Sequence, residues 1–420
     1  MLGTLNEGVR IAWESLKENK IRAGLTILGV AIGVAVVVTM AALITGIRSS
    51  VLESFAAAGP DNFIVTPFDF TDVRVVTGSN RPPWWGRPVI SDEEIRAIGS
   101  LPAVREAVAD FDFNLTVAVG GGVRVSGVSA SGNSSGWPAY TLGEFTAGRN
   151  FTPAEERESR PVIVISSGLA QTLFGPVDPV GQNVRLSVGT RSVNERFTII
   201  GVYEPEPNVF SNAVDQFAIV PRRAAVRRLK ALSPFTFTTV LVVPEPSVTQ
   251  DEARDQVIAY LRGVRGLRPA DENNFAVVQS AQLADFFDRL TGVFFLVMLA
   301  LSSVGLLVGG VGVIGIMLIS VTERTREIGI RKAMGATRKE ILWQFLVEAS
   351  FLTLVGGAIG MVMGAMAAFA VANATPIPAS IPLWSVGAAL GSAVFTGMLF
   401  GLLPAMRASR MEPVAALRFE

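Results

Sequence analysis

The sequence predicts an integral membrane α-helical protein with four transmembrane helices and a large extracytoplasmic α+β domain inserted between helices 1 and 2. Half of the 420 residues are apolar and only 17% are charged, whereas soluble proteins carry about 25% charged residues. Four long runs contain no charged residue, and residues 48–290, which mix polar and apolar positions, separate the first run from the second.

Each uncharged run is long enough to cross a membrane. The runs cover residues 23–47, 291–321, 349–374 and 381–406, and a bilayer core of about 30 Å needs roughly 20 residues at 1.5 Å each. The second run exceeds that length, so we expect it to extend beyond the bilayer. A signal peptide is the alternative for the first run, but its apolar region usually has only about 7–15 residues.

The distribution of basic residues predicts the orientation. Lys and Arg are frequent in residues 1–22, 322–348 and 407–420, whereas the loop at 375–380 carries no charge. Cytoplasmic segments carry the excess of positive charge. We therefore expect both termini and the 322–348 loop in the cytoplasm, and residues 48–290 outside.

Composition also excludes several function classes. The chain has neither His nor Cys, which removes a catalytic His, a Cys nucleophile, disulfides and thiolate zinc sites. The net charge of zero argues against a nucleic-acid partner. The uncharged runs hold none of the ionisable residues that proton carriers, ion channels and intramembrane proteases need.

Glycines recur at fourfold spacing within the predicted spans. Such spacing lets two helix backbones approach closely, although glycine is also common in membrane helices without this role. The candidates for helix packing are Gly305, Gly309, Gly356, Gly360 and Gly364, and Gly29/Gly33 and Gly387/Gly391 show the same spacing.

Residues 1–22 form an amphipathic segment ahead of the first span. Leu5, Val9 and Leu16 fall on one helical face, with charged residues opposite. This pattern predicts a helix in the plane of the cytoplasmic interface. It serves either as a lever that moves with the span or as a passive anchor.

The 322–348 loop alternates charges and then carries helix boundary signals. Gly335 suits a helix C-terminus, and Thr337 with Glu340 forms a capping box for the helix that enters the third span. The loop therefore reads as a short docking helix between two long helices. The alternative is a solvated loop that serves only to orient the protein.

Residues 48–290 read as a two-lobed α+β domain. A strand–helix–strand pattern occurs near each end of the segment, with helices that begin at Ser91 and Thr249. The strands between these patterns predict an inserted second lobe at about 116–234. The Trp84-Trp85 pair either faces a ligand or partner or packs on the lobe's own core, which we favour. Carboxylate clusters at predicted helix starts fit dipole stabilisation better than glycoside hydrolysis.

Several segments resemble a known family. The stretch SVTERTREIGIRKAMGA closely resembles the coupling loop of the FtsX-like permease superfamily, which includes MacB-type ABC transporter permeases. Four further segments are similar to the first span, the extracytoplasmic domain and the C-terminal signature of that family: NKIRAGLTILGVAIGVAVVVTM, RPVIVISSGLAQTLFGPVDPVGQNVRL, FTIIGVYEPE and LLPAMRASRMEPVAALR.

The resemblance implies a coupling helix that docks on a cytoplasmic ATPase. The matching positions are Glu323, Arg324, Arg326, Glu327, Ile328, Gly329, Arg331, Lys332 and Gly335. It also implies a bacterial cytoplasmic membrane protein with membrane lipid around it. The nucleotide-binding motif G-x-x-x-x-G-K-[ST] does not occur in the 420 residues of the sequence. We therefore expect no cofactor on this chain, with ATP bound by a separate ATPase subunit.

The family further implies a non-catalytic permease that pairs with a second copy of itself or with a paralogous permease. The favoured interpretation is mechanotransmission, in which ATP hydrolysis moves the extracytoplasmic domain to export a drug, peptide or similar compound. A periplasmic adaptor or membrane fusion protein is then a further partner. The alternatives are a lipoprotein-releasing permease and a regulator of a cell-wall hydrolase. A direct enzyme is the weakest interpretation, since no nucleophile–base or metal constellation is evident.

Overall fold

The chain folds into two compact units. The computed structural model describes residues 20–59, 61–71, 84–120, 122–189, 195–206, 216–233, 236–375 and 378–417. We call the two units the helix unit (Met1–Ser49 with Arg289–Glu420) and the sheet unit (Ser50–Asp288). The predicted interfacial helix at 1–22 lies outside the described residues, except for its last three positions.

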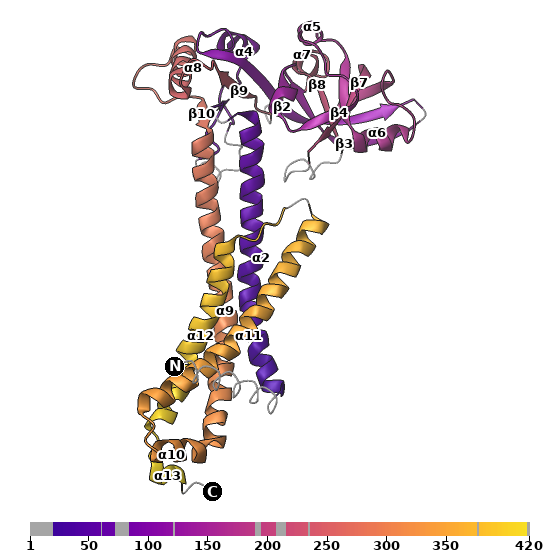
Figure 1. The fold of residues 1–420 in the computed structure, drawn as a ribbon. Helices are drawn as coiled ribbons and strands as arrows, with labels where there is room; N and C mark the ends of the chain where they lie inside the picture. Colours follow the sequence, from indigo (N-terminus) through magenta and orange to yellow (C-terminus); the bar gives the residue numbers. More distant parts are fainter. Residues whose placement is uncertain are drawn as a thin grey trace. The chain divides into compact units, whose positions relative to one another are not determined.

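Four long helices are apolar enough and long enough to cross a membrane. They are α2 (Lys20–Ala58), α9 (Ser280–Glu323), α11 (Arg338–Ala374) and α12 (Leu383–Arg410) (Figure 1). Each extends beyond its uncharged run, because polar and charged residues continue the helix past the apolar stretch. At 1.5 Å per residue, the 44 residues of α9 span about 66 Å, roughly twice the thickness of a bilayer core.

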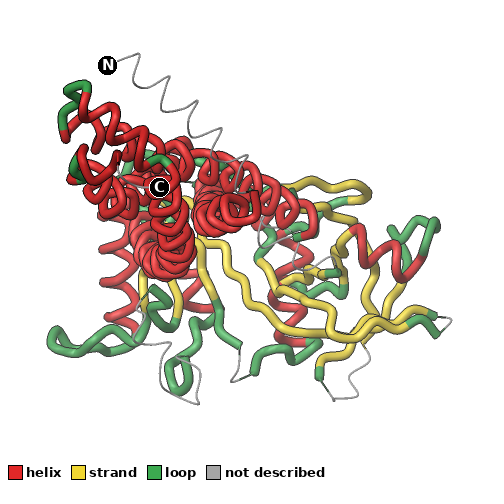
Figure 2. The backbone as a smooth tube through the Cα atoms, turned by 90° about the horizontal axis from the view of Figure 1, so that it is seen from below, coloured by secondary structure: helices red, strands yellow, loops and turns green. Residues whose placement is uncertain are grey.

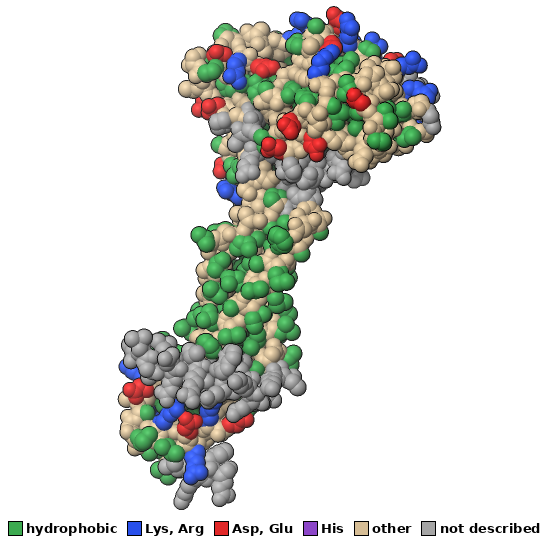
Figure 3. All heavy atoms as spheres, turned by 45° about the vertical axis from the view of Figure 1, so that its right-hand side comes forward, with side chains coloured by type: hydrophobic (Ala, Val, Ile, Leu, Met, Phe, Trp, Pro, Cys, Tyr) green, Lys and Arg blue, Asp and Glu red, His purple; other side chains and the backbone are tan. Residues whose placement is uncertain are grey.

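The surface of the helix unit suits a hydrocarbon environment. Figure 2 views the long helices nearly end-on, gathered in one bundle. Hydrophobic side chains cover the middle of the bundle, and charged side chains gather at the end that holds α10 (Figure 3). Helices whose backbone groups are bonded internally are stable in lipid.

Two short helices complete the helix unit. These are α10 (Thr325–Ala333) and α13 (Pro413–Leu417), which pack against each other at one end of the unit (Figure 1). A buried cluster joins α10 to the long helices through Ile328, Phe345 and Ala405. The short helices are therefore fixed to the bundle by side-chain packing.

A ten-stranded mixed sheet forms the core of the sheet unit. Its strand order is β10-β1-β9-β2-β3-β8-β5-β7-β4, and β6 pairs with both β2 and β7. In the chain, all of these strands fall between α2 and α9. The strands are β1 (Phe63–Thr66), β2 (Val104–Val119), β3 (Arg124–Asn133), β4 (Gly143–Gly148), β5 (Val162–Ser166), β6 (Asn183–Val188), β7 (Glu195–Pro205), β8 (Phe217–Pro221), β9 (Thr239–Pro244) and β10 (Ala276–Gln279).

Two strand–helix–strand units interleave in this sheet, because their strands alternate in the order β10-β1-β9-β2. One consists of β1, α4 (Asp92–Ile98) and β2, and the other of β9, α8 (Gln250–Val264) and β10. The predicted N-caps are confirmed, because Ser91 accepts a bond from the Glu94 backbone and Thr249 from the Glu252 backbone. The helices α4 and α8 pack against the sheet and form one hydrophobic core with it, which includes Phe63 and Leu261.

A second hydrophobic core lies under the inserted strands. It extends from Phe111 to Ala231 and includes Leu169 from α6 (Ser167–Phe174) and Ala224 from α7 (Arg222–Arg227). The strand β2 contributes Ala109 to the first core and Phe111 to the second. One long strand therefore serves both cores, and the lobe limits of 116 and 234 stay a prediction.

Some short elements were not predicted. The strand β4 reads Gly-Glu-Phe-Thr-Ala-Gly, in which glycine occupies both ends and Phe145 is the one large apolar residue. It lies at the edge of the sheet, where only one side needs a partner. The helices α5 (Pro153–Arg157), α6 and α7 have eight residues or fewer, which is too short for a helical period to stand out.

The strand β2 carries an acidic residue whose ionisation is costly. Burial, with a smaller contribution from the Asp112 carboxylate, raises the pKa of Asp110 from 3.8 to about 7. Its cross-strand neighbours are Asn133 and Thr239, and Asn133 Oδ1 is buried without a hydrogen-bond partner among the described residues. The folded protein therefore favours the protonated carboxyl.

We expect Asp110→Asn to stabilise the protein at pH 8 and to have little effect at pH 4. An acid whose pKa is raised by folding lowers the free energy of unfolding as pH rises from about 4 to about 7, and the penalty is constant above that range. The gain in the free energy of unfolding should be about 2 kcal/mol. This is less than the full pKa difference implies, because the Asp110 side chain is partly exposed to solvent. Urea unfolding of the full-length protein in detergent at both pH values measures it. Equal stabilisation at pH 4 and pH 8 would contradict the assignment.

Candidate functional site

The helix α10 is a separate element because both of its ends are broken. At its start, Arg324 has φ −101° and ψ 17°, which interrupts the helix that began with α9. At its end, Gly335 has φ +102°, a left-handed conformation that favours glycine. Two residues later, Thr337 and Glu340 bond reciprocally to each other's backbone N–H and start α11. The predicted C-terminus and capping box are confirmed.

The nine coupling positions divide between two environments. The exposed surface of this segment, which we call the outer face, includes Glu323, Arg326, Glu327 and Gly335. By contrast, Ile328 and Gly329 are buried within the helix unit. Three further positions, Arg324, Arg331 and Lys332, are partly buried and bond to other parts of the unit. Only the exposed group is free to contact another protein without rearrangement.

Two apolar residues on the outer face were not among the predicted site residues. Met334 is 77% exposed and Ile330 is 44% exposed. On the adjoining α13, Val414 is 71% exposed. Such residues are typical of the apolar centre of an interface surrounded by charges. Their presence four residues apart in a charged helix is the sequence signal that could have identified Ile330 and Met334.

Ion pairs organise the charged residues of α10. Arg331 donates to Glu327 Oε1 at 2.6 Å, one helical turn away, and to Gln344 Oε1 of α11 at 3.0 Å. Arg324 lies 3.5 Å from the carboxylate of Glu348, a buried residue of α11. Lys332 donates to the carbonyl oxygens of Ser409 and Met411, at 2.5 and 2.7 Å.

The predicted packing glycines lie at helix crossings. A Cβ on Gly305 would lie 2.9 Å from the Cα of Gly33, and one on Gly309 would lie 2.8 Å from the backbone nitrogen of Val30. On α11, a Cβ on Gly356 would lie 3.1 Å from the carbonyl oxygen of Ile27. The same helix brings Gly360 and Gly364 against Ala31 and Ala35 of α2. These glycines therefore join α2 to α9 and to α11.

In the sheet unit, the two tryptophans behave differently. Trp84 packs against Phe68 and Phe237, with ring centroids 5.2 and 4.7 Å apart. Trp85 is 43% exposed. The first is part of the unit's own packing, as favoured from the sequence, and the second is open to solvent. The predicted carboxylate clusters occupy the first turns of α4, α5 and α8, where they stabilise the helices.

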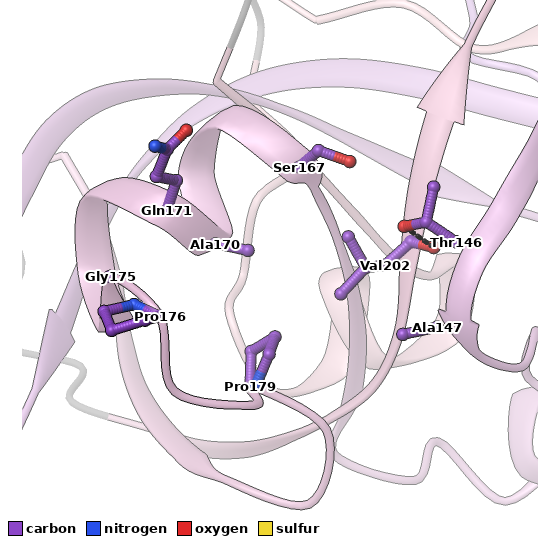
Figure 4. A pocket seen from close by; sticks show the side chains of 9 residues that line it. All are labelled: Thr146, Ala147, Ser167, Ala170, Gln171, Gly175, Pro176, Pro179 and Val202. Atoms are coloured by element: carbon purple, nitrogen blue, oxygen red, sulfur yellow. Dashed lines mark hydrogen bonds between the residues drawn. The ribbon is translucent and has the colours of Figure 1, made fainter.

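A groove of about 510 Å³ lies between α6 and β4. Figure 4 shows Ala170, Pro179 and Val202 around it, with the Thr146 hydroxyl bonded to the Val202 carbonyl. The nine lining residues include no charged or aromatic side chain. Its polar side chains are the hydroxyls of Thr146 and Ser167 and the amide of Gln171.

Comparison with known proteins gives matches along most of the chain. The MacB-like periplasmic core domain matches residues 23–260, and the FtsX-like permease C-terminal region matches residues 299–413. The pyoverdine export ATP-binding/permease protein PvdT of Pseudomonas syringae pv. tomato is 33% identical over 100% of this chain and 60% of its own length. The macrolide export ATP-binding/permease protein MacB of Hyphomonas neptunium is 32% identical over 99% of this chain and 61% of its own length.

The chain thus spans about three fifths of the length of these curated relatives. The crystal structure of the periplasmic region of MacB from Actinobacillus actinomycetemcomitans aligns with 57% of this chain and 97% of that chain. That alignment has a TM-score of 0.44 and a sequence identity of 13%.

Proposed function

This chain belongs to the family of ABC transporter permeases with a MacB-like periplasmic core domain and an FtsX-like C-terminal region, and from that membership we propose that it transmits the work of a cytoplasmic ATPase to its sheet unit. The ATPase binds and hydrolyses ATP, and this chain has no catalytic role. The permease works as a pair, with a second copy of itself or a paralogous permease.

The exposed face of α10 carries this proposal. Arg326 and Glu327 of α10 and Glu323 at the end of α9 are exposed together with the apolar side chains of Ile330 and Met334, and such a mixture is typical of a protein interface. Helix α10 is joined directly to α9 at Arg324. Displacement of α10 by an ATPase is therefore applied to a helix about 66 Å long, whose first residues belong to the sheet unit.

The orientation follows from charge. The positive-inside rule assigns α10, with Arg326, Arg331 and Lys332, and the segment after α12 to the cytoplasm. The sheet unit then lies outside the cytoplasmic membrane of a bacterium. The four long helices cross the membrane, with lipid against their apolar surface.

Export is the favoured activity because the curated relatives are named for pyoverdine export and macrolide export. A drug, a peptide or a similar compound is the corresponding client class, and a periplasmic adaptor or membrane fusion protein is then a partner of the sheet unit. Release of lipoproteins and activation of a cell-wall hydrolase are the alternatives.

The test is purification of the tagged chain from its native membrane in mild detergent, with mass spectrometry of the proteins that accompany it. We expect an ATPase with a G-x-x-x-x-G-K-[ST] motif in roughly equal amount, as a separate subunit. An immunoblot of the native membrane with an antibody against the sheet unit checks whether the ATPase is separate. A polypeptide much heavier than these 420 residues would indicate an ATPase on the same chain. A pure preparation that contains no ATPase, even when an ATP analogue is present during purification, would contradict the proposal.

The proteins that co-purify also identify the class of client. An adaptor favours export, a bound lipoprotein favours lipoprotein release, and a cell-wall hydrolase favours the regulatory role. Each of these outcomes leaves the ATPase-coupled mechanism in place.

A further inference from the structure

The side chain of Lys332 joins α10 to the end of α12. Its ammonium donates to the carbonyl oxygens of Ser409 and Met411, residues that lie 77 and 79 positions away in the chain. The last four carbonyls of a helix lack partners within that helix, and a cation near them interacts favourably with the helix dipole. Helix α12 ends at Arg410, so Lys332 bonds to its C-terminal turn from a neighbouring helix.

Apolar residues of α10 and α12 share one buried cluster. Ile328 is buried in a cluster that includes Ala405 and Ala408 of α12. The two bonds from the Lys332 ammonium add a directional contact to this apolar packing. Ala416 of α13 is also buried, where α13 packs on α10.

Two other cations, Arg324 at the N-cap of α10 and Arg331 within it, bond to a different helix. Arg324 pairs with Glu348 and Arg331 bonds to Gln344, both on α11. Among the cationic side chains of α10 with a described partner, Lys332 is thus the one that reaches α12. Arg326, by contrast, is exposed on the outer face.

We propose that Lys332 is a positioning residue that makes α10 and the corner between α12 and α13 move as one rigid body. The inference rests on the proposed function, since an ATPase must displace α10. Displacement then reaches α12 through the ammonium, in addition to α9 through the backbone. The ammonium of Lys332 makes a contact within the permease, whereas the outer face of α10 contacts the ATPase.

Spin labels test this directly, because the chain contains no cysteine. Ala333→Cys and Glu412→Cys introduce label sites at two exposed positions, one on α10 and one between α12 and α13. We expect the same narrow distance distribution in the nucleotide-free full chain and in its ATP-trapped complex with the co-purified ATPase. Lys332→Met should broaden the distribution or shift it between the two states.

Two variants control for nonspecific effects. Lys339→Met removes the same charge from an exposed lysine near the start of α11 and should leave the distribution unchanged. Lys332→Arg retains the positive charge and several N–H donors and should restore a narrow distribution.

The outcomes separate this inference from the proposed function. If Lys332→Met gives the wild-type distribution in both states, or if the wild-type distance itself changes with nucleotide, the rigid connection does not exist. Loss of ATPase co-purification in Lys332→Met with an unchanged distribution would assign Lys332 to the docking surface instead. If the wild-type chain binds no ATPase, the proposed function fails, while the nucleotide-free comparison still tests the Lys332 contact.

Discussion

Exchanging the charges of Glu327 and Arg331 is expected to abolish stimulated ATP hydrolysis while the protein still inserts into the membrane. The two residues form an ion pair of 2.6 Å one turn apart on α10. In the double variant Glu327→Lys/Arg331→Glu they can pair again, so the helix itself loses only a few tenths of a kcal/mol. An ATPase surface complementary to the native charges would meet like charges instead, at a cost of several kcal/mol.

The measurement is ATP hydrolysis by the reconstituted complex, together with the amount of ATPase that co-purifies. The matched control exchanges another helical ion pair, Asp251 with Arg254 of α8, which are 2.8 Å apart in the sheet unit. That variant should hydrolyse ATP at the wild-type rate. Undiminished hydrolysis in the α10 variant would remove the docking assignment.

The single variants distinguish docking from helix damage. Glu327→Lys alone places two cations one turn apart, which destabilises α10, and Arg331→Glu alone places two anions there. If both single variants lose activity and the double variant regains it, the pair matters only for the stability of α10. If the double variant is as inactive as the single variants, the ATPase contacts these charges directly.

Much of the fold could be predicted because its signals are local. Uncharged runs identify the long helices, and an N-cap such as Ser91 or Thr249 needs only three neighbouring residues to be recognised. The strand β4 was missed because it lies at the sheet edge, has glycine at both ends and contains only one large apolar residue, Phe145. The pairing of β2 with β9 and of β3 with β8 joins segments far apart in the chain, and no local pattern encodes it.

The candidate site shows the same limit. The ends of α10 are evident from Gly335, Thr337 and Glu340, since each acts on its own backbone neighbourhood. The environments of the residues between those ends are not evident. Lys332 bonds to carbonyls of α12 and Arg324 to a carboxylate of α11, whereas Arg326 has the same charge and lies exposed. Only the packing of the helices separates these cations.

Gly360→Leu is expected to destabilise the folded protein by about 3 kcal/mol or more. A Cβ at this position would lie 2.8 Å from the Cα of Ala31 and 2.9 Å from the Cβ of Val34, and it would also clash with the Ala31 carbonyl. The obstacle is mainly helix backbone, which cannot move aside as the end of a flexible side chain can. Because membrane helices associate through close packing instead of the hydrophobic effect, separating α2 from α11 removes most of their contact.

The control is Gly391→Leu on α12, where an added Cβ meets nothing within 4 Å. Leucine is the better helix former by about 0.8 kcal/mol, so this variant should be neutral or slightly stabilised. Thermal unfolding in detergent, followed by size-exclusion chromatography, compares the two. Gly356→Ala should fall between them, since its closest contact is 3.1 Å. If Gly360→Leu and Gly391→Leu are equally stable, the fourfold glycine spacing on α11 reflects composition and not the contact with α2.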